Sequence, residues 1–263
     1  MSNIIDAHSH IFPDKISLKA SQSIGEFYDI TMACEGSLAN LLAQQERAGI
    51  DLSVICSVAT VPEQAQSINN FIASCASEHP GRLLGFGSLH PFMEHPGDEV
   101  ERIISLGLKG IKLHPDFQRF HIDDPKAYPL YEAAAGRLPV LFHTGDCRYE
   151  YSHPARLKKV LSDFPALTAI AAHFGGWSVW EDGADYLADL ENVYVDTCSS
   201  LYSISPQTAL KLIDRFGAQR VLFGTDFPMW NPGEELERFD KIPLSEEQRR
   251  MILHENARRL LNI

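Results

Sequence analysis

Short apolar runs alternate with longer amphipathic stretches along most of the chain. The short runs are rich in Val, Ile, Leu and Phe and are continuously apolar, which is typical of strands buried on both faces of a parallel sheet. Eight strands are predicted, at Ile4–Ala7, Ser53–Val58, Leu83–Leu89, Gly110–Leu113, Val140–His143, Ala169–His173, Val193–Asp196 and Val221–Gly224.

The stretches between these runs have helical spacing. Ile68, Phe71, Ile72 and Cys75 recur at i, i+3, i+4 and i+7, and the preceding amphipathic stretch ends at Gly49, a residue common at helix ends. Alternating strands and helices imply parallel pairing through right-handed crossovers. Eight such units favour an α/β fold of the closed (β/α)8 TIM-barrel type. An open doubly wound sheet is the alternative, although no GxGxxG turn follows the first strand.

The length of 263 residues suits one domain, since (β/α)8 barrels commonly have ~250 residues. We therefore expect residues 1–263 to form a single barrel domain. The segment Asp14–Ser37 shows the least regular pattern and is expected to be a long loop after the first strand. From about residue 232 onward, the pattern predicts C-terminal helices packed outside the barrel.

Composition and charge exclude several classes of protein. The net charge of −12 argues against a nucleic-acid surface, which would need a basic patch. No apolar run approaches the ~20 residues that span a bilayer, so no membrane association is expected. The N-terminus lacks the features of a signal peptide. The five cysteines include no CxxC pair, which favours free thiols and a cytoplasmic location.

Reactive side chains fall at the carboxyl ends of the predicted strands. The first strand ends in Asp6-Ala-His8-Ser-His10, and polar residues end most of the later ones. These later residues are His90, His114, His143, His173, Asp196 and Asp226. The active sites of barrel enzymes are built at this rim. The positions therefore predict one active site to which several strands contribute.

His8 and His10 lie two residues apart on a strand, so both imidazoles should point to the same face. Neutral imidazole is the commonest transition-metal ligand, but one such pair could equally be two surface histidines. His143 alone could be a hydrogen-bonded core residue, and Asp226 alone could be a cap. Together, at matching strand ends, the four predict a site for a divalent metal ion, with Zn²⁺ as the first choice.

Several neighbouring residues are candidates for other roles. Lys112 should face inward and could bind a substrate carboxylate, be carboxylated to bridge two metals, or be buried with a partner. His114 is as compatible with substrate contact as with packing, and Arg148 follows the fifth strand within possible reach of the site. Asp6 and Asp196 could hold a metal-bound histidine in place.

The ordered set of motifs resembles the amidohydrolase superfamily, specifically its amidohydrolase-related branch. That branch includes aminocarboxymuconate-semialdehyde decarboxylase, γ-resorcylate decarboxylase and many predicted metal-dependent hydrolases. The resemblance covers nearly the whole chain and is carried by six segments. They are Asp6–His10, Gly110–Pro115, Phe142–His143, Ala172–Gly176, Gly224–Pro228 and Asn256–Leu261.

The resemblance implies a role for each residue at the rim. The metal ligands would be His8, His10, His143 and Asp226. Asp226 would also transfer protons, and His173 would act on the bound water or substrate, or serve as a further ligand. Family members with two metals often use a residue of the fourth strand as a bridge, where Lys112 lies. The pattern of members with one metal is closer to this sequence.

Two reactions and one non-catalytic role follow from this site. The main hypothesis is a hydrolase that attacks a small amide, ester or lactone with a metal-activated water. Asp226 would take the water's proton, and His173 would stabilise the oxyanion. The alternative is a non-oxidative decarboxylase of a small aromatic or enolic carboxylate, paired with Lys112 or Arg148. A non-catalytic metal- or ligand-binding barrel would not need these acid–base residues. The expected partner is a small-molecule substrate, and a homodimer is the assembly considered.

Overall fold

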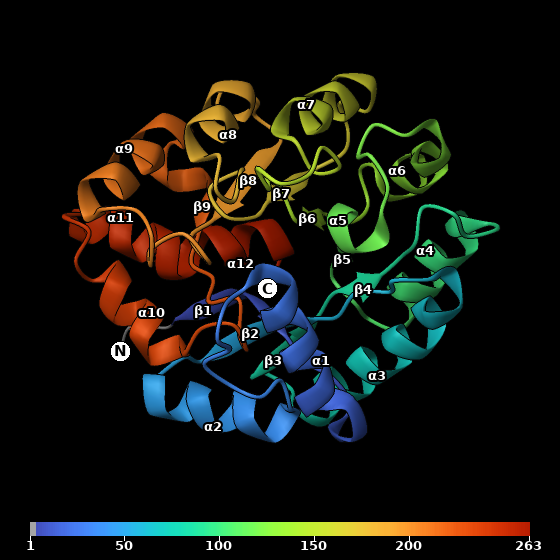
Figure 1. The fold of residues 1–263 in the computed structure, drawn as a ribbon, viewed down its shortest axis with the longest axis horizontal. Coiled ribbons are helices and arrows are strands. Elements are labelled where there is room, and N and C mark those ends of the chain that lie inside the picture. The colour runs from blue at the N-terminus through green and yellow to red at the C-terminus, as the bar shows by residue number, and fades with distance from the viewer. Residues whose placement is uncertain (1–3) are drawn as a thin grey trace.

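Parallel strands form the centre of the protein and helices surround them (Figure 1). The computed structural model describes residues 4–263. The strands are β1 (Ile5–His10), β2 (Leu52–Cys56), β3 (Leu83–Gly85), β4 (Gly87–Ser88), β5 (Ile111–Leu113), β6 (Val140–Phe142), β7 (Ala169–Ala171), β8 (Val193–Asp196) and β9 (Val221–Leu222). Every pair of neighbouring strands is parallel.

Two backbone connections close the sheet into a barrel. The predicted strand Leu83–Leu89 is split at Phe86, whose N–H still donates to the carbonyl of Ile55 on β2 (2.9 Å), while Gly87 begins the pairing with β5. At the other edge, the N–H of Ala7 on β1 donates to the carbonyl of Phe223 beyond β9 (2.8 Å). The prediction of a closed (β/α)8 barrel is therefore confirmed.

Helices follow the strands and cover the outside of the barrel (Figure 1). The α-helices are α1 (Asp14–Tyr28), α2 (Leu38–Ala48), α3 (Ala65–Glu78), α4 (Pro96–Ser105), α5 (Pro115–Gln118), α6 (Tyr128–Ala134), α7 (Pro154–Asp163), α8 (Trp180–Leu187), α9 (Pro206–Phe216), α10 (Pro232–Phe239), α11 (Glu246–Arg250) and α12 (Asn256–Leu261). Short 3₁₀ turns lie at Pro62–Gln64, Pro125–Ala127 and Ala218–Arg220, and a π-helical turn at Met251–Glu255 joins α11 to α12. None of the helices described in residues 4–263 is long and apolar enough to cross a membrane.

The apolar strands divide the core into an outer and an inner part. Outward-facing side chains of the strands pack against the surrounding helices in one large cluster. A smaller cluster combines Val54, Leu84, Phe86 and Leu141 with Leu261 of α12. Burial of the strands on both faces explains their continuously apolar sequences and leaves their carboxyl ends free to carry polar groups.

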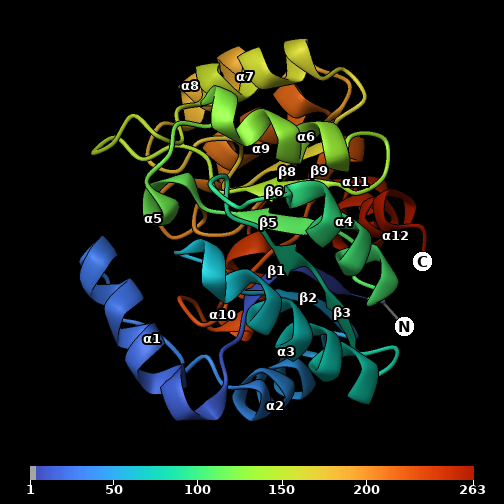
Figure 2. The same cartoon turned by 90° about the vertical axis from the view of Figure 1, so that its right-hand side faces the viewer.

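Helix α1 corrects the prediction of a long loop over Asp14–Ser37. Its buried positions are mostly small or polar, namely Ser17, Ser21, Gly25 and Tyr28. Ile16 and Leu18 are 50% and 58% exposed instead. The helical period is therefore present, but hydrophobicity does not mark it. Figure 2 shows α1 at one end of the barrel, with the chain's C-terminus at the other.

Candidate active site

A cavity of about 350 Å³ opens at the carboxyl ends of the strands. It contains almost every residue predicted for the site. The predicted residues that line it are His8, His10, Lys112, His114, His143, His173 and Asp226. Helix α1 contributes Phe27 and Tyr28 to the same lining, and Trp177 adds a further ring. The cavity is therefore aromatic, with polar groups from several strands converging on it.

Three of the four predicted metal ligands meet at one point. Nε2 of His8 lies 3.1 Å from Nε2 of His10, and Oδ1 of Asp226 lies 3.6 Å and 3.5 Å from these two nitrogens. The strand register shifts between Asp6 and Ser9, where β1 carries a bulge or irregularity, a feature that can re-aim side chains. The two imidazoles converge as the i, i+2 spacing predicted.

Asp196 of β8 orients His8 from the side opposite this point. Its Oδ2 lies 2.9 Å from Nδ1 of His8, and both side chains are fully buried. Burial alone would raise the pKa of Asp196, but the adjacent His8 and His173 lower it to about 2. An ionised Asp196 accepts the Nδ1 proton of His8, so the Nε2 lone pair points away from it toward the cationic Lys112 and toward His10 and Asp226.

Asp6 was considered as a group that holds a metal-bound histidine in place, but it binds backbone and hydroxyl groups instead. Its carboxylate accepts the backbone N–H groups of His8 (3.1 Å) and Thr225 (3.0 Å) and the hydroxyl groups of Ser9 (2.5 Å) and Thr225 (2.7 Å). Asp6 therefore joins the first strand to the segment after β9 and does not contact an imidazole ring. Burial raises its pKa to about 6.

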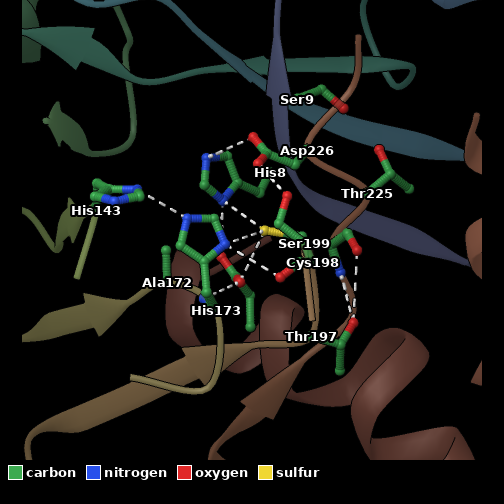
Figure 3. Close-up of polar contacts among 12 residues, drawn as sticks. His8, Ser9, His143, Ala172, His173, Thr197, Cys198, Ser199, Thr225 and Asp226 are labelled. Carbon is green, nitrogen blue, oxygen red and sulfur yellow. Dashed lines mark hydrogen bonds and ion pairs between the residues drawn. The ribbon is translucent and has the colours of Figure 1, made fainter. Parts of the chain in front are cut away.

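His143 lies beside the other predicted ligands but does not join them. Its Nδ1 is 3.0 Å from Nε2 of His173, and its buried Nε2 has no hydrogen-bond partner among residues 4–263. Within the described residues it forms no ion pair with Asp226 and no hydrogen bond with His8 or His10. His173 stands between the two groups: its Nδ1 donates to the carbonyl of Cys198 (3.1 Å), and its ring stacks on His8 at 5.7 Å (Figure 3).

The carboxylate of Asp226 is held by a serine that sequence reasoning missed. The Ser199 hydroxyl donates to Oδ2 of Asp226 (2.5 Å) and accepts from Nε1 of Trp230 (2.9 Å). Figure 3 shows Ser199 directly beside Asp226. Burial would raise the pKa of Asp226, but His8, His173, His10 and this hydrogen bond hold it well below its usual range.

Backbone conformation at the rim is unusual where the site residues lie. His173, Ser199 and Asp226 have φ values of 62°, 46° and 55°, in the left-handed region that non-glycine residues seldom adopt. Such strain concentrates at functional sites. Gly224 permits close packing there, since a Cβ on it would lie 3.2 Å from Cβ of His8.

Lys112 of β5 points into the cavity as predicted. It is fully buried, and its Nζ lies 3.1 Å from Nε2 of His8. Within residues 4–263, Lys112 forms no ion pair with a carboxylate. A buried ammonium group without a directly paired anion is costly, so Lys112 can pair with an anionic group that enters the cavity.

Arg148 does not line the cavity and has partners of its own. Its Nε and Nη2 donate to the two carboxylate oxygens of Asp146 (2.9 and 2.7 Å), and Nη1 donates to the carbonyl of Phe27 (2.7 Å). The guanidinium also lies 4.9 Å from the ring of Phe27 and 5.5 Å from that of Trp177. Arg148 therefore secures the end of α1, and this geometry does not favour the predicted contact with substrate.

Asp116 is the most prominent residue that the sequence did not single out. It lies in α5, directly after the His114-Pro115 pair, and its side chain is buried and lines the cavity. Its Oδ2 accepts from the Ser152 hydroxyl (2.6 Å) and lies 3.5 Å from Nε2 of His143, while Oδ1 has no hydrogen-bond partner in the described part of the chain. Burial is the main reason that its pKa is raised to about 7.

A sequence model of the amidohydrolase family matches residues 5–263. The chain belongs to the amidohydrolase family. Among its relatives, 2-amino-3-carboxymuconate-6-semialdehyde decarboxylase of Dictyostelium discoideum is 24% identical over 98% of this chain and 91% of that protein. γ-Resorcylate decarboxylase of Polaromonas sp. strain JS666 is 25% identical over 76% of this chain and 77% of that protein.

Solved structures of amidohydrolase-fold proteins share this architecture. An uncharacterised TIM-barrel protein of Bordetella bronchiseptica superimposes with a TM-score of 0.82 and 25% identity, covering 99% of this chain and 98% of the other. A dihydroxybenzoic acid decarboxylase of Polaromonas sp. JS666, with bound manganese and the inhibitor 2-nitroresorcinol, gives a TM-score of 0.77 at 19% identity. That match covers 100% of this chain and 97% of the other. The family confirms the prediction of an enzyme, and the relatives favour decarboxylation over the hydrolysis expected as the main reaction.

Proposed function

We propose that this amidohydrolase-family enzyme is a metal-dependent decarboxylase of a small aromatic or enolic carboxylate. The observation that carries the proposal is Lys112. Its ammonium group is fully buried in the cavity, 3.1 Å from Nε2 of His8. A substrate carboxylate would balance this charge beside the metal-binding residues. The names of the decarboxylase relatives support the same substrate class.

The donor set suits a divalent cation. Ligands bound to one ion at about 2.0–2.2 Å in tetrahedral geometry lie about 3.3–3.6 Å apart, and the atoms of His8, His10 and Asp226 are separated by 3.1–3.6 Å. His143, with its unpartnered buried Nε2, is proposed as the fourth ligand. Imidazole and carboxylate suit both Zn²⁺ and Mn²⁺, and manganese occupies the related decarboxylase structure.

The metal, when bound, supplies positive charge that orients the substrate and stabilises the electrons released toward the ring. Lys112 binds the carboxylate that will leave. Asp226, ionised at rest, takes a proton from solvent as the substrate binds and passes it to the carbon that bears this carboxylate, while Ser199 holds its Oδ2. The C–C bond then breaks, the electron pair stays on the protonated carbon, and CO₂ leaves. His173, whose Nδ1 donates to the carbonyl of Cys198, accepts from Nδ1 of His143 through Nε2 and so positions this proposed ligand.

Product analysis separates this reaction from hydrolysis. The purified, metal-loaded protein would be incubated in D₂O with a panel of hydroxybenzoates and enolic carboxylates, and separately with esters, lactones and amides in H₂¹⁸O. The proposal predicts release of CO₂ and one deuterium on the carbon that carried the carboxylate. Incorporation of ¹⁸O into products, without release of CO₂, would refute it in favour of the hydrolase.

A cytoplasmic location is part of the same proposal. All five cysteines are free thiols in the structure, which suits a reducing compartment. Cys198 lies 3.1 Å from Nδ1 of His8 and 3.2 Å from Nδ1 of His173. Because oxidation of this thiol would place new polar atoms between the two imidazoles, a reducing environment protects the site.

A further inference from the structure

We propose that Tyr28 and Asp116 form a subsite that binds a hydroxyl group of the substrate. The inference rests on the proposed function, because it describes the molecule that Lys112 holds by its carboxylate. Both residues line the cavity, one from α1 and the other from α5. One supplies a hydrogen-bond donor and the other an acceptor, and a hydroxyl group can satisfy both at once.

The donor follows from the proton positions on His114. The backbone N–H of Phe117 donates to Nδ1 of His114 (3.3 Å), so the proton of this neutral imidazole is on Nε2. Nε2 therefore donates to the hydroxyl oxygen of Tyr28, 2.8 Å away. The hydroxyl hydrogen of Tyr28 is then left without an acceptor among residues 4–263, and Tyr28 lines the cavity.

The acceptor is Oδ1 of Asp116. It is buried and has no hydrogen-bond partner within the described residues, whereas Oδ2 of the same carboxylate already accepts from Ser152. An unsatisfied buried carboxylate oxygen costs free energy unless a ligand donates to it. Asp116 lies in the cavity wall, so its unpartnered oxygen is the acceptor proposed for a ligand bound there.

Aromatic rings also lie around the pair. Phe117 stacks on His114 with centroids 3.8 Å apart and planes at 7°, which fixes the imidazole that positions Tyr28. Trp177 packs edge-on against Tyr28 at 5.0 Å. A flat aromatic ligand that carries a hydroxyl group suits these surroundings, since hydrogen bonds strengthen where water is excluded.

A second cation is the competing explanation for the same atoms. His114, Asp116 and His143 could jointly offer ligand atoms to a metal ion. Both nitrogens of His114 already have hydrogen-bond partners, however. We therefore favour the hydroxyl group, and the metal content of an Asp116 variant decides between the two.

The test uses phenol, anisole and toluene as probes of the metal-loaded full chain. Phenol both donates and accepts, anisole only accepts, and toluene does neither. Dissociation constants would be measured by NMR titration at pH 8, for the wild type, Tyr28→Phe and Asp116→Asn. Tyr149→Phe and Asp123→Asn are matched controls, because these residues lie outside the cavity lining. Thermal melts and metal content would accompany every variant.

The wild type should bind phenol about tenfold more tightly than toluene, with anisole between them, as expected for one to two net hydrogen bonds. In Tyr28→Phe, anisole should bind no more tightly than toluene. In Asp116→Asn, the affinity for phenol should fall to the affinity for anisole. Toluene should bind equally to all folded variants. Equal binding of phenol and toluene to the wild type, or loss of metal from Asp116→Asn, would overturn the subsite.

Benzoate tests the proposed function separately in the same titrations. If Lys112→Met weakens the binding of benzoate but not the binding of phenol, both proposals stand. If benzoate binds independently of Lys112 while phenol still requires Asp116, the decarboxylase proposal loses its support and the hydroxyl subsite remains. If benzoate requires Lys112 and phenol shows no preference over toluene, only the subsite fails.

Discussion

His8 and Asp196 are 188 positions apart in the sequence, yet Nδ1 of one lies 2.9 Å from Oδ2 of the other, and both side chains are fully buried. The barrel brings them together because β1 and β8 both end at the same rim. The contact fixes the proton of His8 on Nδ1 and turns Nε2 toward His10 and Asp226. Carboxylates in this position raise the basicity of a metal-bound histidine.

Asp196→Asn should therefore weaken metal binding roughly 10- to 100-fold, the usual cost of losing such a partner. The amide keeps the shape of the carboxylate but loses its charge. Competition with a chelator would measure the affinity, with Asp189→Asn, an exposed aspartate, as the control. Unchanged affinity in a folded Asp196→Asn protein would mean that His8 does not bind the metal through Nε2.

Lys112→Met should abolish tight binding of carboxylates while the protein still folds and holds metal. Charged hydrogen bonds contribute about 1.5–3 kcal/mol, so benzoate affinity should fall roughly 10- to 100-fold. Stability should stay level or rise, because a buried ammonium group is replaced by an apolar chain. Lys109 is exposed and lies just before β5, so Lys109→Met controls for a general effect of losing a positive charge. Calorimetry gives the affinity, and equal losses in both variants would contradict the assignment.

The strand-end residues were predictable because parallel strands of a barrel all point their carboxyl ends to one rim. His8, His10, His173 and Asp226 each lie at the end of an apolar run or within about three residues after it. Once the barrel has formed, these residues meet at its rim. The distance of His143 from the others was not predictable, because it depends on its contact with His173.

Residues supplied by helices and loops were harder to predict. The inner face of α1 carries Ser17, Ser21 and Gly25, so hydrophobicity did not reveal that Tyr28 reaches the cavity. Asp116 belongs to a helix of four residues, too short to show a period. Arg148 was expected at the substrate, but the nearer carboxylate of Asp146 holds its guanidinium.

Arg148→Met should loosen α1. The variant loses the hydrogen bond to the carbonyl of Phe27 and the stacking of the guanidinium on nearby rings. Amide hydrogen exchange in α1 should accelerate about tenfold, since local opening follows the contacts that hold a segment. Arg47→Met on α2, another exposed arginine, should leave this exchange unchanged. Slow exchange retained in the Arg148 variant would show that Arg148 is not needed to hold the helix.

Glu235 should make the protein less stable as pH rises. Burial raises its pKa from 4.5 to about 7 against the opposing effect of Arg238. Between these values the folded state keeps a proton that the unfolded chain releases, so the free energy of unfolding falls from about pH 4.5 to 7. The shift corresponds to about 3 kcal/mol. Chemical denaturation should show a shallower decline in Glu235→Gln than in the wild type or in Glu234→Gln, a largely exposed neighbour. Parallel curves of stability against pH for Glu235→Gln and the wild type would refute this prediction.

Ser199 and the adjacent Ser200 offer a matched pair for testing Asp226. Each accepts a hydrogen bond from a tryptophan ring, Ser199 from Trp230 (2.9 Å) and Ser200 from Trp180 (3.0 Å). Only Ser199 also donates to the carboxylate of Asp226. Replacing either serine with alanine therefore leaves a tryptophan N–H without its partner, but only one replacement frees Asp226.

Ser199→Ala should lower metal affinity about tenfold, because an unconstrained carboxylate must be ordered again when it binds the ion. Ser200→Ala should leave metal affinity unchanged while losing a similar amount of stability, about 1 kcal/mol. Chelator competition and thermal denaturation on the two variants would separate these effects. Equal metal affinities would show that the strained backbone at Asp226, with φ of 55°, positions this carboxylate without help from Ser199.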